Sequence, residues 1–446
     1  MAIPIAETYW LQRARIPACF LAENVPIEPF ELVRPRDRDS GSIAIDLQIS
    51  AGRVTQILPA DTAEINSQPA VDLRHGQIWP CFVDLHTHLD KGHIWPRTDN
   101  PDGSFDGALT ASLQDAATYW TAEDVYQRLE FGLRCSYAHG TQAIRTHIDA
   151  RAPQGEISLE VFASLRAAWA DRLKLQAVSL VTLDYFQTAE GERLADRMAE
   201  VSGLLGGVAY MHPEIEAQLD RTFALAQARG LDLDFHADET GDSNAIALRK
   251  IAEAALRHQF TGQIVCGHCC SLAQQSEAAV AETLALVKEA GIGIVSLPMC
   301  NLYLQDRQPG RTPRWRGVTL LHECQQAGIP VAVASDNCRD PFYGFGDHDV
   351  LEVFEQSVRI AHLDRPYGNW PRAVTTTPAR LMGLTQIGEI GLGYPADLVL
   401  FKGRNFSELL SRSQHDRIVL RNGRAIDTTL PDYAELDDLL EQGERR

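Results

Sequence analysis

Short β-rich runs alternate with longer helical segments over most of this chain, from about residue 80 onward. Eight such runs occur, at residues 81–90, 141–149, 173–183, 203–210, 231–239, 262–270, 291–298 and 328–337. The segments between them have helical apolar spacing and are long enough to cross over from one parallel strand to the next. Eight β/α units predict an α/β fold, a (β/α)8 TIM-type barrel. An open doubly wound sheet is the alternative, but no glycine-rich nucleotide loop follows the first strand.

The two chain ends have a different pattern. Residues 44–50 and 53–59 are strand-like pieces separated by turns, and the tail from 388 to 426 again alternates strand and turn. We therefore expect one small β-sandwich built from residues 1–75 and 388–446, beside a barrel of residues 76–387.

Composition excludes several classes of partner. A formal net charge of −19 disfavours nucleic acid, because binding there depends on neutralising phosphates. No apolar run is long enough for a membrane helix, and the first residues show no secretory signal. The nine cysteines have no framework spacing, which suits reduced thiols. We expect a cytoplasmic protein that acts on a small molecule.

Histidines gather where the predicted strands end. In a barrel, catalytic groups lie at the C-terminal ends of the strands. The residues at such positions are His86 and His88 on strand 1, His147 on strand 2, His236 on strand 5, His268 on strand 6 and Asp336 on strand 8. His86 and His88 are two residues apart, so both side chains point to one face of the strand. This clustering predicts a single site.

The residue types predict a metal centre. His86, His88, His236 and Asp336 would supply three imidazoles and one carboxylate to one divalent ion, and zinc and iron suit this set equally. An open position could hold water, whose pKa would fall from about 16 to about 7. His268 is either a further ligand or a hydrogen-bond partner of the hydroxide. Glu239, three residues after His236, is the predicted proton carrier.

Other polar groups are given less weight. Cys266, Cys269 and Cys270 suggest a zinc knuckle, but no second cysteine pair follows at that spacing, so buried strand cysteines are the better interpretation. His212 and Glu214 match half of the nucleic-acid deaminase motif, whose cysteine half is absent. His147 could line the barrel floor or the substrate pocket. His93 and five further histidines are assigned no role.

These features together resemble the amidohydrolase superfamily. Residues 143–149, 221–239, 301–323 and 334–354 look like the corresponding segments of its cytosine deaminase branch, which acts in pyrimidine metabolism. The resemblance implies a hydrolase of C–N bonds in which a metal-bound hydroxide attacks the amino-bearing carbon of a small N-heterocycle. Glu239 and Asp336 would move protons and His268 would orient the hydroxide. Relatives with two metals carry a strand-4 lysine, which residues 203–210 lack.

One departure from the cytosine deaminase pattern concerns the substrate. The family's strand-3 glutamine is not matched: Thr182 lies nearest that position, with Asp184 just beyond. Asn337 replaces the aspartate that follows the metal-ligating aspartate. The predicted substrate-binding residues are Thr182, Asp184, His147, Asn337 and Phe342. Cytosine, isocytosine, 5-methylcytosine, creatinine, aminotriazines and pterins all stay candidate substrates.

Two other functions compete with this interpretation. A cyclic amide hydrolase of the hydantoinase or dihydroorotase type would need two metal ions. A non-catalytic binding homologue would lack a ligand or proton carrier, and this chain lacks none. Related barrels commonly associate, so a homo-oligomer is a candidate state.

Overall fold

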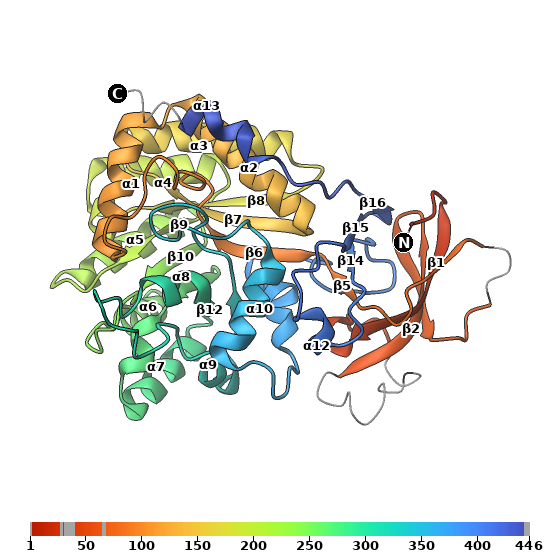
Figure 1. The fold of residues 1–446 in the computed structure, drawn as a ribbon. Coiled ribbons are helices and arrows are strands. Elements are labelled where there is room, and N and C mark those ends of the chain that lie inside the picture. The colour runs from red at the N-terminus through yellow and green to blue at the C-terminus, as the bar shows by residue number, and fades with distance from the viewer. Residues whose placement is uncertain (1, 27–29, 31–40, 65–67, 441–446) are drawn as a thin grey trace. The chain divides into compact units, whose positions relative to one another are not determined.

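The computed structural model describes residues 2–26, 30, 41–64 and 68–440 (Figure 1). Contacts divide the chain into two compact units. The first comprises Met1–Val83, Ser136–Gln142 and Val350–Leu430, and the second comprises Asp84–Cys135, Ala143–Asp349 and Pro431–Arg446. The predicted domains, 1–75 with 388–446 and 76–387, have different boundaries from these compact units, and the predicted division remains a proposal.

Eight parallel strands correspond to the eight predicted runs. They are β6 (Phe82–Thr87), β7 (Thr141–Asp149), β8 (Lys174–Leu180), β9 (Leu205–Ala209), β10 (Leu233–Ala237), β11 (Ile264–His268), β12 (Gly293–Ser296) and β13 (Val331–Val333). They form one sheet of order β6-β7-β8 and another of order β9-β10-β11-β12-β13.

Isolated parallel bridges connect these two sheets. Val178 pairs with Leu204 and Thr182 with Val208, which joins the β8 region to β9. Thr87 of β6 pairs with Asp336, just after β13. The strands therefore follow one another in the cyclic order of a (β/α)8 barrel.

Helices follow the strands along the chain (Figure 1). They are α1 (Phe105–Tyr119) and α2 (Ala122–His139) after β6, α3 (Gln154–Ala168) after β7, α4 (Ala189–Glu200) after β8, α5 (Ile215–Arg229) after β9, α6 (Ala247–Arg257) after β10, α7 (Glu277–Glu289) after β11, and α8 (Pro298–Leu304) and α9 (Leu321–Ala327) after β12. Ser104, Thr188 and Ser276 cap helix N-termini with their hydroxyls. No helix in the described part of the chain is both long enough and apolar enough to cross a membrane.

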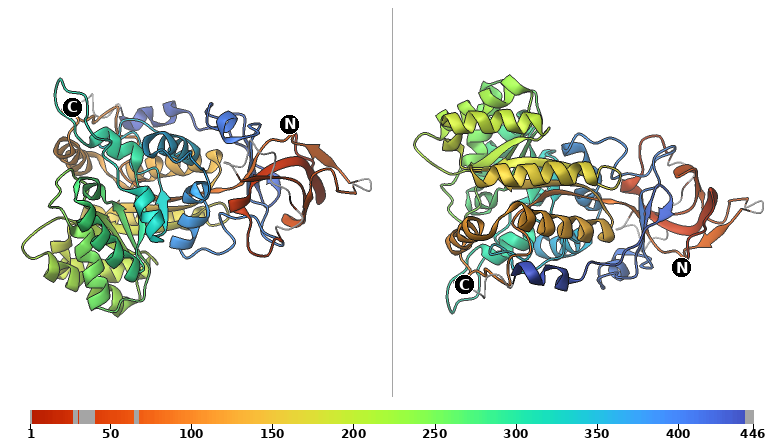
Figure 2. Two further views of the ribbon diagram at one scale, coloured as in Figure 1. Left: turned by 90° about the horizontal axis from the view of Figure 1, so that it is seen from below. Right: turned by 90° about the horizontal axis from the view of Figure 1, so that it is seen from above.

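The first unit contains two small sheets from both chain ends. The first sheet, red in Figure 2, has the order β3-β2-β1-β4 and consists of β1 (Thr8–Pro17), β2 (Ser42–Ser50), β3 (Arg53–Pro59) and β4 (Ala70–Asp72). The second has the order β16-β15-β14-β5 and consists of β5 (Ile78–Pro80), β14 (Leu398–Leu400), β15 (Ile418–Arg421) and β16 (Arg424–Ala425). Strand β5 pairs antiparallel with β14, so the two ends of the chain share a sheet. Helices α10 (Val350–Ala361), α11 (Thr376–Leu381) and α12 (Phe406–Leu409) belong to this unit.

Trp79 of β5 lies at the centre of an aromatic core in the first unit. Its side chain is fully buried. The rings around it are those of Phe20, Phe82, Phe354, Phe401 and Phe406, with centroids 4.8–6.2 Å from the Trp79 ring. Most of these contacts are edge-to-face, which is a favourable aromatic geometry. The indole nitrogen donates to Oε1 of Gln77 at 2.8 Å, so its polar atom is satisfied.

We expect Trp79→Ala to lower the free energy of unfolding by about 3–5 kcal/mol, because it removes a large side chain from a packed core. Urea denaturation measures this change. Leu113→Ala is the control, because Leu113 is 60% exposed on α1 and its truncation should cost about 0.5 kcal/mol or less. Equal costs for the two variants would contradict the role assigned to Trp79.

Candidate metal centre and active site

The four predicted metal ligands lie together in the second unit. Nε2 of His88 is 3.3 Å from Nε2 of His236 and 3.2 Å from Oδ1 of Asp336. Nε2 of His86 lies 3.6 Å from the same carboxylate oxygen. All four side chains are buried. Ligand atoms about 2.1 Å from a shared divalent ion are separated by similar distances.

The protonation state of these groups fits a bound cation. Burial lowers the pKa of His86, His88 and His236 below its usual value, so the three imidazoles are neutral at neutral pH. Burial opposes ionisation of Asp336, but its neighbours His88, His268 and Cys300 together outweigh this effect, and the pKa of the carboxyl is lowered. Both ring nitrogens of His86 have no hydrogen-bond partner among the described residues. Buried, electron-rich atoms without proton donors are typical of a metal site.

The pairing of β6 with the segment after β13 positions the ligands. The amide of Asp336 donates to the carbonyl of His86 at 2.8 Å, and Oγ1 of Thr87 donates to the carbonyl of Asp336 at 2.8 Å. Gly267 of β11 leaves space beside His86, since a Cβ there would lie 2.9 Å from Cε1 of the imidazole. Asp336 has a φ of 65°, a strained conformation of the kind found at functional sites.

Glu239 and His268 meet at Asn301, a residue of α8 that the sequence analysis missed. Nδ2 of Asn301 lies 3.2 Å from Oε1 of Glu239 and 2.9 Å from Nδ1 of His268. If the amide donates to Nδ1, the neutral imidazole carries its proton on Nε2. That nitrogen is buried and has no hydrogen-bond partner in the described part of the chain. A protonated Nε2 can donate a hydrogen bond but cannot ligate a metal, which favours the orienting role for His268.

The surroundings of the Glu239 carboxyl favour its protonated form. Burial raises its pKa well above the usual value, the charge of Asp336 adds to this effect, and Lys91 opposes it. A carboxylic acid that stays protonated near neutral pH can donate a proton to a reacting group.

Lys91 is a second residue without a sequence assignment. Its buried ammonium donates to Oδ1 of Asp149 at 2.9 Å and lies 5.4 Å from the ring centre of Phe342. It follows His88 by three residues, so β6 and the segment after it carry two of the candidate ligands and a buried cation.

The predicted substrate-binding residues fall into two groups. Asn337 and Phe342 are buried on the segment after β13, where Nδ2 of Asn337 donates to Oδ2 of Asp340 at 2.7 Å. Thr182 and Asp184 follow β8 and are exposed.

His147, the fifth predicted substrate-binding residue, is fully buried. Its ring centre is 3.9 Å from that of His86 and 4.7 Å from that of His236. It therefore packs against the candidate metal ligands, and its role in substrate binding remains a prediction.

The chain belongs to the amidohydrolase family, whose model matches residues 131–426. It is 53% identical to a pterin deaminase from Rhizobium rhizogenes over 441 residues, which cover 99% of this chain and 98% of the relative. It is 24% identical to N-isopropylammelide isopropyl amidohydrolase from Pseudomonas sp. (strain ADP), over 85% of this chain and 93% of that protein. The crystal structure of 5-methylcytosine deaminase from Klebsiella pneumoniae, liganded with phosphonocytosine, is similar with a TM-score of 0.78 and 25% identity, over 95% of this chain and 99% of that one.

These similarities confirm the expected family and the barrel fold class. The chain is an enzyme that hydrolyses C–N bonds. The roles of the individual residues remain proposals.

The buried histidines predict a pH-dependent stability. Burial lowers the pKa of His268 to about 4, whereas an unfolded imidazole titrates near 6.5. Between these values the unfolded chain binds more protons, so stability falls as the pH falls. We expect His268 alone to contribute a loss of about 3 kcal/mol between about pH 6.5 and pH 4.

Urea midpoints of the chelator-treated protein across this pH range measure the effect. His268→Asn, which cannot take up the proton, should show a shallower slope. Identical slopes for the two proteins would contradict the assigned pKa.

Proposed function

We propose that this enzyme is a metal-dependent hydrolytic deaminase that releases ammonia from the 2-amino group of a pterin. Water breaks the bond between the ring carbon and the amino nitrogen, a carbon–oxygen bond replaces it, and the products are the 2-oxo ring and ammonia. The observation that carries the proposal is the 53% identity to a pterin deaminase over 99% of this chain. Pterins were among the substrates considered from the sequence, whereas cytosine and a role in pyrimidine metabolism remain less supported.

The residues suit a single divalent ion, and zinc and iron remain equal candidates. His86, His88, His236 and Asp336 would hold it, and the bound ion would supply Lewis acidity towards water. Strand β9 carries no lysine to bridge a second ion, which supports one ion in this site. The cyclic amide hydrolase alternative requires such a pair.

Glu239 supplies the proton in this proposal. Its protonated carboxyl donates to the ring nitrogen beside the amino-bearing carbon. The attacking water gives up two protons: one returns to Glu239, and Asp336 and Glu239 carry the other to the leaving amino group. Nε2–H of His268 donates a hydrogen bond to the attacking oxygen. Asn301 holds both groups through contacts of 3.2 Å and 2.9 Å, and so acts as a positioning residue.

An aromatic cluster on the segments after β12 and β13 supports a bicyclic substrate. Phe342 packs edge-to-face against Phe105, with ring centres 5.4 Å apart. Tyr303 and Tyr343 pack with Phe342 in the same cluster. A pterin offers a second aromatic ring for such a surface, and cytosine does not. We assign the pyrimidine edge of the substrate to Thr182, Asp184 and Asn337, with Phe342 beneath the rings.

A screen for ammonia release tests the substrate. With pterin, isocytosine, cytosine, 5-methylcytosine, creatinine and an aminotriazine, we expect kcat/KM for pterin to exceed that for cytosine by about 100-fold or more, because a site that pairs with one hydrogen-bonding edge rejects another. Release from cytosine or creatinine at equal or higher kcat/KM would overturn the proposal.

Substitution at Glu239 tests the mechanism. Glu239→Gln should lower kcat by about 10²- to 10⁴-fold while metal content, measured by elemental analysis, stays unchanged. Asn301→Ala should lower kcat less and also leave the metal in place, because it removes only the positioning contact.

His86→Ala is the comparison, since it should lose both catalytic metal and activity. Turnover near the wild-type rate in Glu239→Gln with metal bound would exclude Glu239 as the proton carrier. Retention of both properties in His86→Ala would exclude the metal assignment.

A further inference from the structure

We propose that His93, Cys338 and His348 form a second metal site, separate from the four ligands described above. The nitrogens of the two imidazoles and the sulfur of the thiol lie within 4.8 Å of one another. The three side chains are buried. They come from three segments: the loop after β6, the segment after β13, and the residues just before α10.

His93 is the clearest indication of a ligand. Its side chain is 1% exposed, and neither of its ring nitrogens has a hydrogen-bond partner among the described residues. Leaving a buried polar ring unsatisfied costs free energy, which a bound cation would recover. Its ring centre lies 5.3 Å from that of His348, so the two imidazoles approach one another directly.

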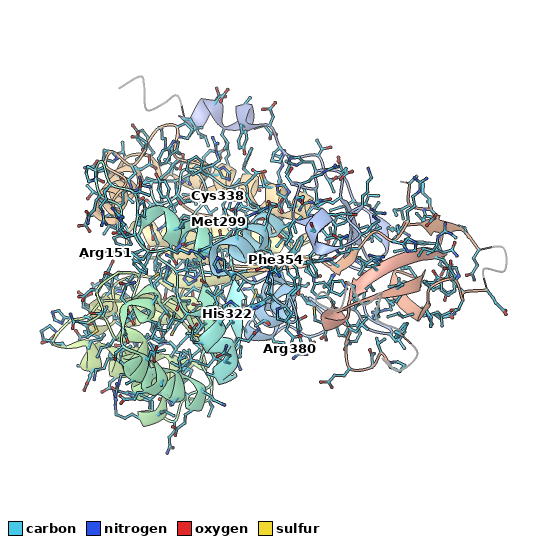
Figure 3. All side chains as sticks on the ribbon, turned by 60° about the horizontal axis from the view of Figure 1, so that its bottom comes forward. Arg151, Met299, His322, Cys338, Phe354 and Arg380 are labelled. Atoms are coloured by element: carbon cyan, nitrogen blue, oxygen red, sulfur yellow. The ribbon has the colours of Figure 1, made fainter. Side chains whose placement is uncertain are left out.

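The backbone makes room for this cluster. Gly132 lies inside α2 beside His348, where a Cβ would lie 2.9 Å from Cδ2 of Leu89 and 3.1 Å from Nε2 of the imidazole. Glycine inside a helix costs stability, so its presence there suits a close approach. His93 and His348 have φ values of 65° and 55°, in the left-handed region that non-glycine residues rarely adopt. Cys338, between them in the chain, is labelled in Figure 3.

The ligand types indicate the class of cation. Two imidazoles and one thiol suit zinc, or a softer ion such as copper(I), and do not suit magnesium or calcium. His93 also lines a cavity of about 320 Å³ with Arg339 and Tyr433. Water from this cavity could complete the coordination of an ion that three protein ligands hold.

The proposed second site lies on the same two segments as two of the candidate catalytic ligands. The amide of His93 donates to the carbonyl of Cys338 at 3.1 Å, and the amide of Trp95 donates to the carbonyl of Arg339 at 2.8 Å. An ion bound by His93 and Cys338 would fasten the same two segments through their side chains. These segments also carry His88 and Asp336, so the second site would hold two catalytic ligands in position.

Cobalt(II) loading of the wild-type protein tests the proposal by absorption. A thiolate bound to cobalt gives a charge-transfer band in the near ultraviolet, and the set of His86, His88, His236 and Asp336 contains no sulfur. We expect the wild-type protein to show this band and to bind about two ions per chain. Cys338→Ser should lose the band and retain about one ion, and His93→Gln should weaken the band.

The controls separate this site from the catalytic one. Cys324→Ser, which removes a buried cysteine of α9, should leave the band and the metal content unchanged. His86→Ala should keep the band although it loses activity, so failure of the proposed function would not affect this result. A fully loaded wild-type protein without the band would overturn the proposal. So would a band that survives Cys338→Ser and disappears in Cys300→Ser, because Cys300 lies beside Asn337.

Discussion

The site depends on one constraint: three neutral imidazoles and a carboxylate are buried with their acceptor atoms directed at a common point. Nε2 of His88 and Nε2 of His236 are 3.3 Å apart, and Oδ1 of Asp336 lies 3.2 Å from the same nitrogen of His88. A single proton on Nε2 of His88 can serve only one of these two neighbours, so the buried cluster cannot satisfy all of its close polar contacts by itself. A bound cation would resolve this conflict, and its proposed ligands come from strand ends that are far apart in the chain.

Much of this arrangement was predictable because it follows from strand geometry. The two-residue spacing of His86 and His88 places both on one face, and the carboxyl ends of parallel strands meet at one rim of a barrel. His236 and Asp336 join them for the same reason. Eight apolar runs with helical segments between them were sufficient to predict the (β/α)8 class, because the signal repeats along the chain.

The positions of Asn301, Lys91 and His93 depend on the conformation of loops, and loop sequences have no repeating pattern from which a conformation could be predicted. Asn301 contacts Glu239 and His268 from a short helix after β12. Its neighbouring residues form no motif that would separate it from an asparagine on the surface. Lys91 and His93 lie near the ligands in sequence, yet their partners come from residues more than fifty positions away. The sequence left His93 without a role because its neighbours in space, Cys338 and His348, lie on segments that show no shared motif.

The bridge between Thr87 and Asp336 joins the first strand of the series to the segment after the last one, at the place where the proposed metal ligands meet. A substitution that shifts the register of β6 would displace His86, His88 and the backbone partner of Asp336 together. Exposed residues outside this bridge, such as Asp184 after β8, can change without moving His86, His88 or Asp336.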